Sequence, residues 1–263
     1  MGDLAALRER LTELAPVMVA FSGGADSAFL AWVAHDTLGA GRATAVTAVS
    51  PSLAPDELAD CRALVDEWGL QWLPLATDEL ANPAYSVNDG ERCYYCKAEL
   101  MDAVGPAADR EGATVVLGVN LDDLGDHRPG QRAAAERGAA FPLVDAGFTK
   151  ADVRSTSQQL GLRTWDKPAA ACLASRIPYG TPVSLGVLQS VAEAESGLRA
   201  IGFRQLRVRH YGDLARIEVD LGDLARVVDQ RDAVVATVRA AGYRYVTLDL
   251  EGFRSGNLNG ALP

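Results

Sequence analysis

The sequence has few cysteines and no long apolar run, and each absence excludes a class of protein. No apolar stretch reaches the roughly 18 to 20 residues that span a bilayer, so we expect no membrane segment. The first 16 residues lack the basic and then apolar layout of a signal peptide, which predicts a cytoplasmic protein. Four cysteines among 263 residues are too few for a disulfide scaffold, and closely spaced cysteines in a reducing compartment are typical of metal binding or catalysis.

Positive charge is also scarce. The chain has 25 Lys and Arg residues against 35 Asp and Glu residues, a formal net charge of −10. Nucleic-acid binders usually carry a basic face, so this balance argues against a nucleic-acid partner. The deficit lies in the first part of the chain, because residues 1–165 carry 24 acidic and 13 basic side chains, whereas residues 166–263 carry 11 and 12.

The order of apolar and amphipathic segments predicts an α/β fold. Short apolar runs typical of buried parallel strands are expected at residues 17–21, 43–49, 70–75 and 114–118. Helical patterns between them predict a parallel sheet with helices on both faces. After about residue 165 the pattern becomes a loop, a helix, a hairpin, a helical stretch and a last strand. We therefore expect two domains, an α/β domain of residues 1–165 and a small α+β domain of residues 166–263 that carries Cys172 and contacts to substrate or to other subunits.

Residues 22–27, with the sequence Ser-Gly-Gly-Ala-Asp-Ser, lie between the first expected strand and the next helix. Glycines allow a close approach of the backbone to an anion, and the N-terminus of a helix offers N–H groups and the positive end of its dipole. The Gly-Lys-Ser/Thr of a Walker loop is absent. This string predicts a phosphate-binding loop, in which Asp26 either begins the helix or contacts ATP or magnesium.

Three cysteines have a chemical role in our interpretation. Cys93 and Cys96 form a Cys-x-x-Cys pair at the start of an expected helix, and Cys172 lies far along the chain in a loop. Three thiolates can hold three irons of a 4Fe-4S cluster, or they can bind zinc with His127 or His210 as the fourth ligand. Alternatively, the pair is a redox pair and Cys172 a reactive thiol.

The fourth cysteine differs from the others. Cys61 shares an apolar helical stripe with Leu58 and Val65, which predicts a core residue. Cys172, by contrast, lies among small residues with Arg176 four positions on, a setting unlike a core.

Two further groups of polar residues are candidates for anion binding. Asn120, Asp123 and Arg128 follow the fourth expected strand, where ligands collect in open α/β sheets. Arg207 and Arg209 alternate along a later strand and so share a face, with Glu218 on the partner strand. The second group is either a cross-strand ion pair or a site for the phosphate of a substrate.

Four strings together resemble a known family. Residues 22–27 match the Ser-Gly-Gly-x-Asp-Ser signature of the PP-loop ATP pyrophosphatases, which bind the pyrophosphate of ATP. Residues 92–97, 118–130 and 170–180 resemble the LarE family of that superfamily, and the likeness covers nearly the whole chain. LarE proteins are pyridinium-3,5-biscarboxylic acid mononucleotide sulfur transferases, which help to build the nickel-pincer nucleotide cofactor of lactate racemase.

The resemblance implies a reaction and a set of site residues. The enzyme adenylates each carboxylate of the mononucleotide with ATP and Mg²⁺ and replaces it with a thiocarboxylate. The implied catalytic residues are Cys172, Arg176 and Asp26. The implied ATP site comprises Ser22, Gly23, Gly24, Asp26, Ser27, Ser50, Gly118, Asn120, Asp123 and Arg128. The implied substrate or anion site comprises Arg207, Arg209 and Glu218.

Two sources of sulfur occur within this family. Some members sacrifice the cysteine that matches Cys172, which becomes dehydroalanine, whereas members with three cysteines bind a 4Fe-4S cluster whose open iron can hold a sulfide. Because Cys93, Cys96 and Cys172 are all present, we favour the cluster. The sequence does not identify the sulfur donor, and the family implies a homo-hexamer built from dimers.

Two other interpretations stay open. One is a PP-loop tRNA thiolase with a Cys-x-x-Cys cluster, which the net charge of −10 disfavours. The other is a non-catalytic module that senses a nucleotide or a metal, which the density of polar residues at strand ends disfavours. An enzyme would release pyrophosphate from ATP, whereas a sensor would not. Adding either tRNA or the pyridinium mononucleotide would then distinguish the two enzymes by which substrate supports the reaction.

Overall fold

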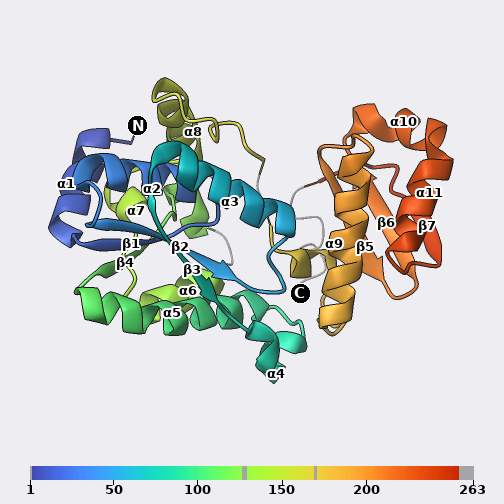
Figure 1. Ribbon diagram of the computed structural model, residues 1–263, viewed down its shortest axis with the longest axis horizontal. Helices are drawn as coiled ribbons and strands as arrows, with labels where there is room; N and C mark the ends of the chain where they lie inside the picture. Colours follow the sequence, from blue (N-terminus) through green and yellow to red (C-terminus); the bar gives the residue numbers. More distant parts are fainter. Residues whose placement is uncertain (1, 126–128, 169–170, 255–263) are drawn as a thin grey trace. The chain divides into compact units, whose positions relative to one another are not determined.

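The computed structural model describes residues 2–125, 129–168 and 171–254 (Figure 1). These residues form two compact units. Residues 2–79 and 91–168 make up the first unit, and residues 80–90 and 171–254 make up the second. The division thus differs from the expected single boundary at residue 165. Residues 80–90 lie within the first part of the chain but belong to the second unit.

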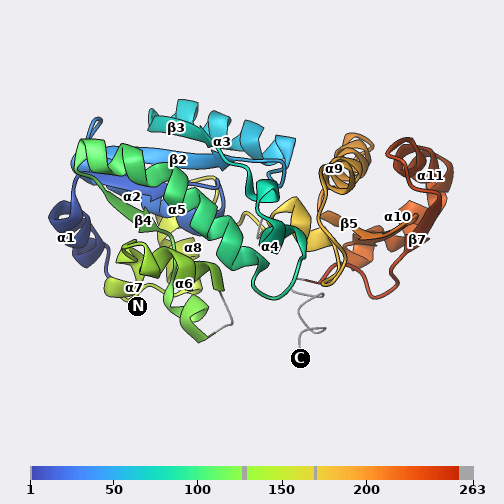
Figure 2. The ribbon, with the colours of Figure 1, turned by 90° about the horizontal axis from the view of Figure 1, so that it is seen from below.

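The first unit is a parallel sheet of four strands in the order β3-β2-β1-β4. Its strands are β1 (Val17–Ala20), β2 (Ala43–Val49), β3 (Gln71–Ala76) and β4 (Thr114–Leu117). Its helices are α1 (Leu4–Leu14), α2 (Ala25–Leu38), α3 (Pro55–Trp68), α5 (Arg92–Glu111), α6 (Pro129–Glu136), α7 (Pro142–Asp145) and α8 (Lys150–Gln159). Helices α2 and α3 lie on one face of the sheet and α5 and α6 on the other (Figure 2). The expected α/β fold with helices on both faces is confirmed.

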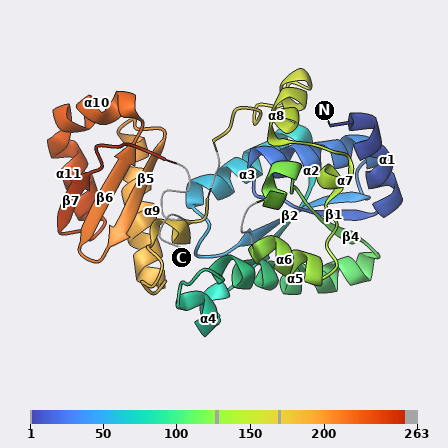
Figure 3. The same cartoon turned by 180° about the vertical axis from the view of Figure 1, so that it is seen from behind.

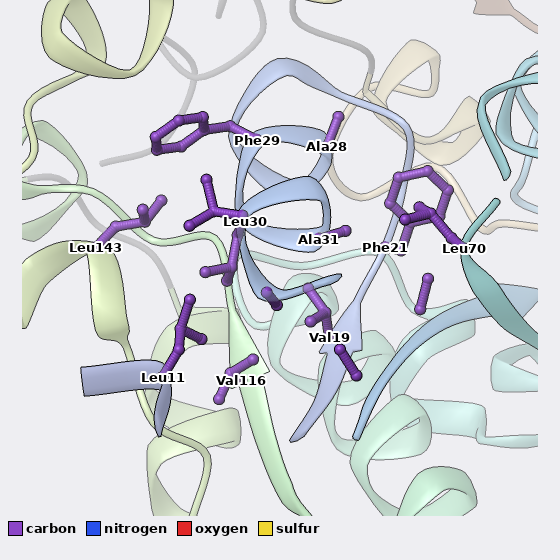
Figure 4. Close-up of a cluster of buried hydrophobic side chains, with 14 of the residues drawn as sticks. Leu11, Val19, Phe21, Ala28, Phe29, Leu30, Ala31, Leu70, Val116 and Leu143 are labelled. Carbon is purple, nitrogen blue, oxygen red and sulfur yellow. The ribbon is translucent and has the colours of Figure 1, made fainter. Parts of the chain in front are cut away.

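Each face of this sheet has its own core, because successive side chains of a strand point to opposite faces. Val17 and Val19 of β1 join a buried cluster with residues of α1, α2, α3, α7 and α8, and Figure 4 shows Val19 beside Leu30 and Val116 in this cluster. Met18 points the other way and joins residues of α5 and α6. Helix α2 is apolar almost all round and is buried in the first core, so the loop in front of it is held on a fixed element.

The second unit has a sheet of three strands in the order β5-β6-β7, with β6 antiparallel to β5 and parallel to β7 (Figure 3). Its elements are α4 (Pro83–Ser86), α9 (Leu185–Ala200), β5 (Leu206–Tyr211), β6 (Leu214–Val219), α10 (Leu224–Asp229), α11 (Arg231–Ala240) and β7 (Tyr245–Leu248). Helices α9 and α11 pack together and cover the apolar side of the sheet. The expected hairpin at Gly212 joins β5 and β6, whereas the expected single helical stretch is divided into α10 and α11 at Gln230.

Asn88 explains why residues 80–90 belong to the second unit. It is fully buried with a φ of 60°, and its side-chain amide donates to the carbonyl oxygens of Pro178 and Thr181 at 2.8 Å each. The backbone amide of Val183 also donates to the carbonyl oxygen of Ser86 at 2.9 Å. These hydrogen bonds join two segments that lie about ninety positions apart in the chain.

None of the helices in the described ranges combines the length and the apolar character needed to cross a membrane.

Candidate active site

The phosphate loop connects β1 to α2 and is organised by two hydroxyl groups. The side chains of Ser22 and Ser27 are hydrogen-bonded to each other at 3.1 Å, and the amide of Ser22 donates to the Ser27 hydroxyl at 3.2 Å. Ser27 also donates to the carbonyl oxygen of Gly24 at 3.1 Å. Gly24 is the N-cap of α2 and has no side chain to cover the first amide groups of this 14-residue helix. The loop is therefore shaped before a ligand arrives, with the helix N-terminus open to an anion.

Two glycines are required by close approaches of the backbone. Gly23 has a φ of 69°, and a Cβ atom there would lie 3.0 Å from the Sγ atom of Cys61. Gly118 follows β4, and a Cβ atom there would lie 2.9 Å from the carbonyl carbon of Asp26 and 2.9 Å from the amide nitrogen of Ser27. The end of β4 thus presses directly on the first turn of α2, a distance that only glycine allows.

Asp26 is held from two sides. Its carboxylate accepts a hydrogen bond from the side-chain amide of Asn120 at 3.3 Å and forms an ion pair with Lys150. Asn120 follows β4 and is buried, and Lys150 begins α8 behind the capping box of Thr149 and Asp152. Lys150 was not among the predicted site residues, although the helix cap marked its position.

The turn after β4 uses its acidic side chains for backbone contacts. Asp123 accepts a hydrogen bond from the amide of Asn120 at 3.2 Å, and Asp122 accepts one from the amide of Lys150 at 2.7 Å. These carboxylates fix the turn and the start of α8 beside Asp26. Arg128, which the sequence placed in the ATP site, lies outside the described residues.

Ser50 lies just beyond β2, at the same edge of the sheet as the phosphate loop. Its hydroxyl donates to the buried carboxylate of Glu79 at 2.7 Å and accepts a hydrogen bond from the amide of Ser52 at 3.2 Å. The carboxyl ends of parallel strands meet at one edge, where ligands bind in open α/β sheets. Ser50 therefore lies at the edge of the sheet where ligands bind in this class of fold, and its contact with the nucleotide stays a prediction.

Lys167 brings a positive charge to the phosphate loop. Its Nζ atom lies 3.7 Å from the position that a Cβ atom on Gly23 would take. It is held by two carboxylates of α3, at 2.5 Å from Asp60 and 2.9 Å from Glu57. Burial opposes its charge, but the hydrogen bonds that it donates to Asp60 and Glu57 raise the pKa of Lys167 above its ordinary value. Nothing in the sequence pattern singled out this lysine.

The four cysteines, all among the described residues, form no disulfide and fall into different settings. Cys93 is exposed and Cys96 partly buried, both in the first two turns of α5, where a spacing of three puts them on the same side. Cys172 is partly buried in the second unit. Cys61 is fully buried, and burial raises the pKa of its thiol to about 11, so it is protonated and unreactive at neutral pH.

Metal ligands do not gather within the described parts of the chain. No group of three His, Cys, Asp or Glu side chains there is arranged to hold a metal ion. His210, one candidate zinc ligand, contacts the Tyr243 hydroxyl through Nδ1 at 3.2 Å. The other candidate, His127, is outside the described residues.

Arg176 and Arg209 are buried and point to protein groups. Arg176 is 3% exposed and forms an ion pair with Glu195, and Arg209 is 5% exposed and forms one with Glu218. The sequence did not select Glu195, although it occupies a core position of α9 between Val191 and Leu198. An acidic residue such as Glu195 within an apolar helical stripe could have indicated a buried ion pair.

Arg207 differs from its neighbours. Its guanidinium donates to the carbonyl oxygen of Leu206 at 2.8 Å and lies over the ring of Phe253. Burial, together with the nearby charge of Arg176, lowers the pKa of Arg207 to about 10. The nearby carboxylate of Glu195 acts in the opposite direction and partly offsets this lowering of the pKa.

A parallel sheet whose first strand leads through Ser-Gly-Gly-Ala-Asp-Ser into a buried helix defines a PP-loop protein of the ATP pyrophosphatase class. No protein-family model matches the chain. The chain is 38% identical over 259 residues to the pyridinium-3,5-bisthiocarboxylic acid mononucleotide synthase of Lactiplantibacillus plantarum, and the match covers 98% of this chain and 94% of that protein. The chain therefore belongs to the LarE family and is an ATP-dependent enzyme.

Two other proteins are similar to this chain. An uncharacterized protein of Synechocystis sp. is 47% identical over 259 residues, which cover 97% of this chain and 96% of that protein. The solved structure of NMN synthetase from Francisella tularensis matches with a TM-score of 0.48 and 18% identity, over 64% of this chain and 76% of that chain.

Proposed function

We propose that this enzyme converts pyridinium-3,5-biscarboxylic acid mononucleotide to the bisthiocarboxylic acid mononucleotide, the precursor of the nickel-pincer cofactor of lactate racemase. The observation that carries this proposal is the 38% identity, over nearly the full length of both chains, to a protein named as the synthase of that product. The phosphate loop before α2 supplies the ATP site that such a synthase needs.

The chemistry proceeds in two steps for each carboxylate. A carboxylate oxygen of the substrate attacks the α-phosphorus of ATP, and pyrophosphate leaves, which gives an acyl adenylate. A sulfur nucleophile then attacks the acyl carbon, and AMP leaves with the original carboxylate oxygen. Residues 22–27 and the first amides of α2 hold the departing pyrophosphate. Asp26 lies within this loop, and its carboxylate would bind the Mg²⁺ that accompanies the phosphates.

The direct test supplies the purified enzyme with ATP, Mg²⁺, sulfide and the pyridinium biscarboxylate mononucleotide. We expect pyrophosphate release that depends on the mononucleotide and a product heavier by the exchange of oxygen for sulfur. The same release with tRNA in place of the mononucleotide would overturn the proposal in favour of a tRNA thiolase.

Lys167 binds the pyrophosphate portion of ATP in this proposal. Replacing it with methionine keeps the apolar stem but removes the charge and leaves Glu57 and Asp60 unneutralised beside the loop. We expect the KM for ATP to rise about tenfold, the usual value of one charge-assisted contact. Steady-state pyrophosphate release measures this.

The matched control is Arg163→Met. Arg163 pairs with the same helix, through Asp60 at 2.9 Å and Glu67 at 2.7 Å, but it is an exposed pair. We expect its KM for ATP to change by less than about twofold. If Lys167→Met and Arg163→Met had equal KM values for ATP, Lys167 would have no role in ATP binding.

Sulfur delivery is proposed to use a 4Fe-4S cluster. The support is the chemistry of the donors, since Cys93 and Cys96 are exposed or partly exposed thiols on one side of α5 and Cys172 is a third partly exposed thiol, although the described residues do not bring three metal ligands together. When bound, it supplies an iron site that can hold a transferable sulfide.

A second route is favoured by the position of Cys172 itself. Its thiol is partly exposed in the second unit, so it can act as a nucleophile. Its Sγ atom would attack the acyl adenylate to give a thioester. Loss of the Cα proton and cleavage of the Cβ–S bond would then release the thiocarboxylate and leave dehydroalanine.

One anaerobic experiment separates the two routes. The cluster route predicts about four irons per chain after reconstitution, loss of iron in Cys93→Ala, and an unchanged mass of the polypeptide after turnover. The sacrificial route predicts full transfer without iron and a loss of one H₂S from the Cys172 peptide. Iron analysis and intact mass, before and after turnover, decide between them.

Arg207, which lies on β5 where the sequence predicts an anion site and whose guanidinium lies over the ring of Phe253, is proposed to bind the phosphate of the mononucleotide. The homo-hexamer and the cytoplasmic location stay predictions.

A further inference from the structure

The segment of residues 171–176, here called the cysteine segment, is held by two buried guanidinium groups. It contains Cys172 and the short 3₁₀ helix Leu173–Arg176. The amide of Ser175 donates to the carbonyl oxygen of Cys172 at 2.9 Å, and Leu173 and Ala174 are buried. The turn is thus anchored on its apolar side while the thiol stays partly exposed.

The first guanidinium belongs to Arg176. Its Nη1 atom donates to the carbonyl oxygen of Ala171 at 2.6 Å and to that of Cys172 at 3.0 Å. Its other two nitrogens form a bidentate pair with Glu195, at 2.9 Å each. Glu195 has no exposed surface and also accepts the backbone amide of Val208 at 3.0 Å. Burial favours the neutral acid, but the hydrogen bonds from Arg176 hold the pKa of Glu195 below its ordinary value.

The second guanidinium belongs to Arg209 of β5. Its Nη1 atom donates to the carbonyl oxygen of Ser175 at 2.9 Å, at the other end of the turn. Its Nε and Nη2 atoms donate to Glu218 of β6 at 3.0 and 2.8 Å. Glu218 is fully buried as well. Glu195 also pairs with Arg199 at 2.9 Å, and Glu218 also pairs with Arg216 at 3.1 Å. Two ion-pair networks, one on α9 and one across the hairpin, therefore end on carbonyl groups of the same turn.

Buried ion pairs of this kind are weak evidence for stability, because desolvation cancels much of their attraction. Bidentate geometry, by contrast, fixes the position of a guanidinium closely. We propose that Glu195 and Glu218 act, through Arg176 and Arg209, as positioning residues that set the conformation of the cysteine segment and thereby aim Cys172 for sulfur transfer. Only the part of this inference that concerns sulfur transfer rests on the proposed function. The conformation of the cysteine segment is a property of the protein without ligands.

The test is Glu195→Gln, which keeps the size of the side chain and removes its charge. We expect the amides of Ser175 and Ile177 to exchange with deuterium at least about tenfold faster, because their turn loses one of its two anchors. We also expect alkylation of Cys172 by iodoacetamide, located by peptide mass spectrometry, to become several times faster. With substrates present, the yield of thiocarboxylate per pyrophosphate falls, while pyrophosphate release itself persists.

The matched control is Glu193→Gln, an exposed acid two positions earlier on α9. It removes the same charge from the same helix without touching the cysteine segment, and all three readouts should equal those of the unaltered enzyme. Should Glu195→Gln fail to fold, Arg176→Lys serves instead, since lysine keeps the charge but cannot hold Glu195 and two carbonyl groups together.

The outcomes are distinct. A lower melting temperature with unchanged exchange at Ser175 and Ile177 and unchanged Cys172 alkylation in the folded state would show a merely structural role and overturn the inference. Faster exchange and alkylation, in an enzyme whose sulfur transfer does not need Cys172, would leave the held conformation intact and exclude both proposed sulfur routes instead.

Discussion

Replacing Cys172 with alanine is expected to reduce thiocarboxylate formation by about 10³-fold or more, the usual cost of removing a group that takes part in the chemical step. Both sulfur routes need this thiol, one as a cluster ligand and one as the sulfur itself. The phosphate loop, Asp26 and Lys150 all belong to the first unit, whereas Cys172 belongs to the second. Because neither route uses this thiol before the acyl adenylate forms, pyrophosphate release that depends on the mononucleotide should persist in this variant. Mass spectrometry of the nucleotide product and a pyrophosphate assay measure the two steps separately.

The control for this variant is Ser196→Ala, an exposed position on α9 of the same unit. It should leave both measurements unchanged. Full sulfur transfer by Cys172→Ala would exclude the cluster route and the sacrificial route together. Loss of pyrophosphate release along with transfer would instead make Cys172 necessary for adenylation, contrary to our expectation.

Replacing Gly118 with alanine is expected to damage the ATP site although the change adds one methyl group. Its Cβ atom would lie 2.9 Å from backbone atoms of Asp26 and Ser27, which cannot rotate away. The end of β4 and the first turn of α2 must therefore move apart, at a cost of about 1–3 kcal/mol in the free energy of unfolding. We expect kcat/KM for pyrophosphate release to fall about 100-fold, because a shift of this kind displaces the phosphate loop. Denaturant unfolding and steady-state kinetics measure the two effects.

Gly186→Ala provides the comparison. Gly186 is exposed in the first turn of α9, and a Cβ atom there meets nothing within 4 Å. We expect unchanged kinetics and a gain in stability of up to about 1 kcal/mol, since alanine loses less backbone entropy than glycine. If Gly118→Ala behaved in the same way, the close approach of β4 to α2 would have no part in ATP binding.

The phosphate loop and the parallel sheet could be predicted from the sequence because each depends on neighbouring residues. The apolar run before residues 22–27 forms a buried strand, and the glycines that follow need no distant partner to make a turn. The core role of Cys61 followed in the same way from the helical spacing of its apolar neighbours. Local pattern also placed Ser22 and Ser27 in one loop, which the hydrogen bonds between their hydroxyls bear out.

Only the tertiary structure decided which charged side chains meet. Lys150 pairs with Asp26 across 124 positions, and Lys167 pairs with Glu57 across 110 positions. Arg176, expected among the catalytic groups, turns inward to Glu195, and residues 80–90 join the second unit through the amide of Asn88. Sequence by itself determined the elements and the loop, since strand, turn and helix preferences act over a few residues. The ends of long charged side chains meet only after the chain has packed. Which of them form pairs therefore could not be predicted from the sequence and is known only from the folded protein.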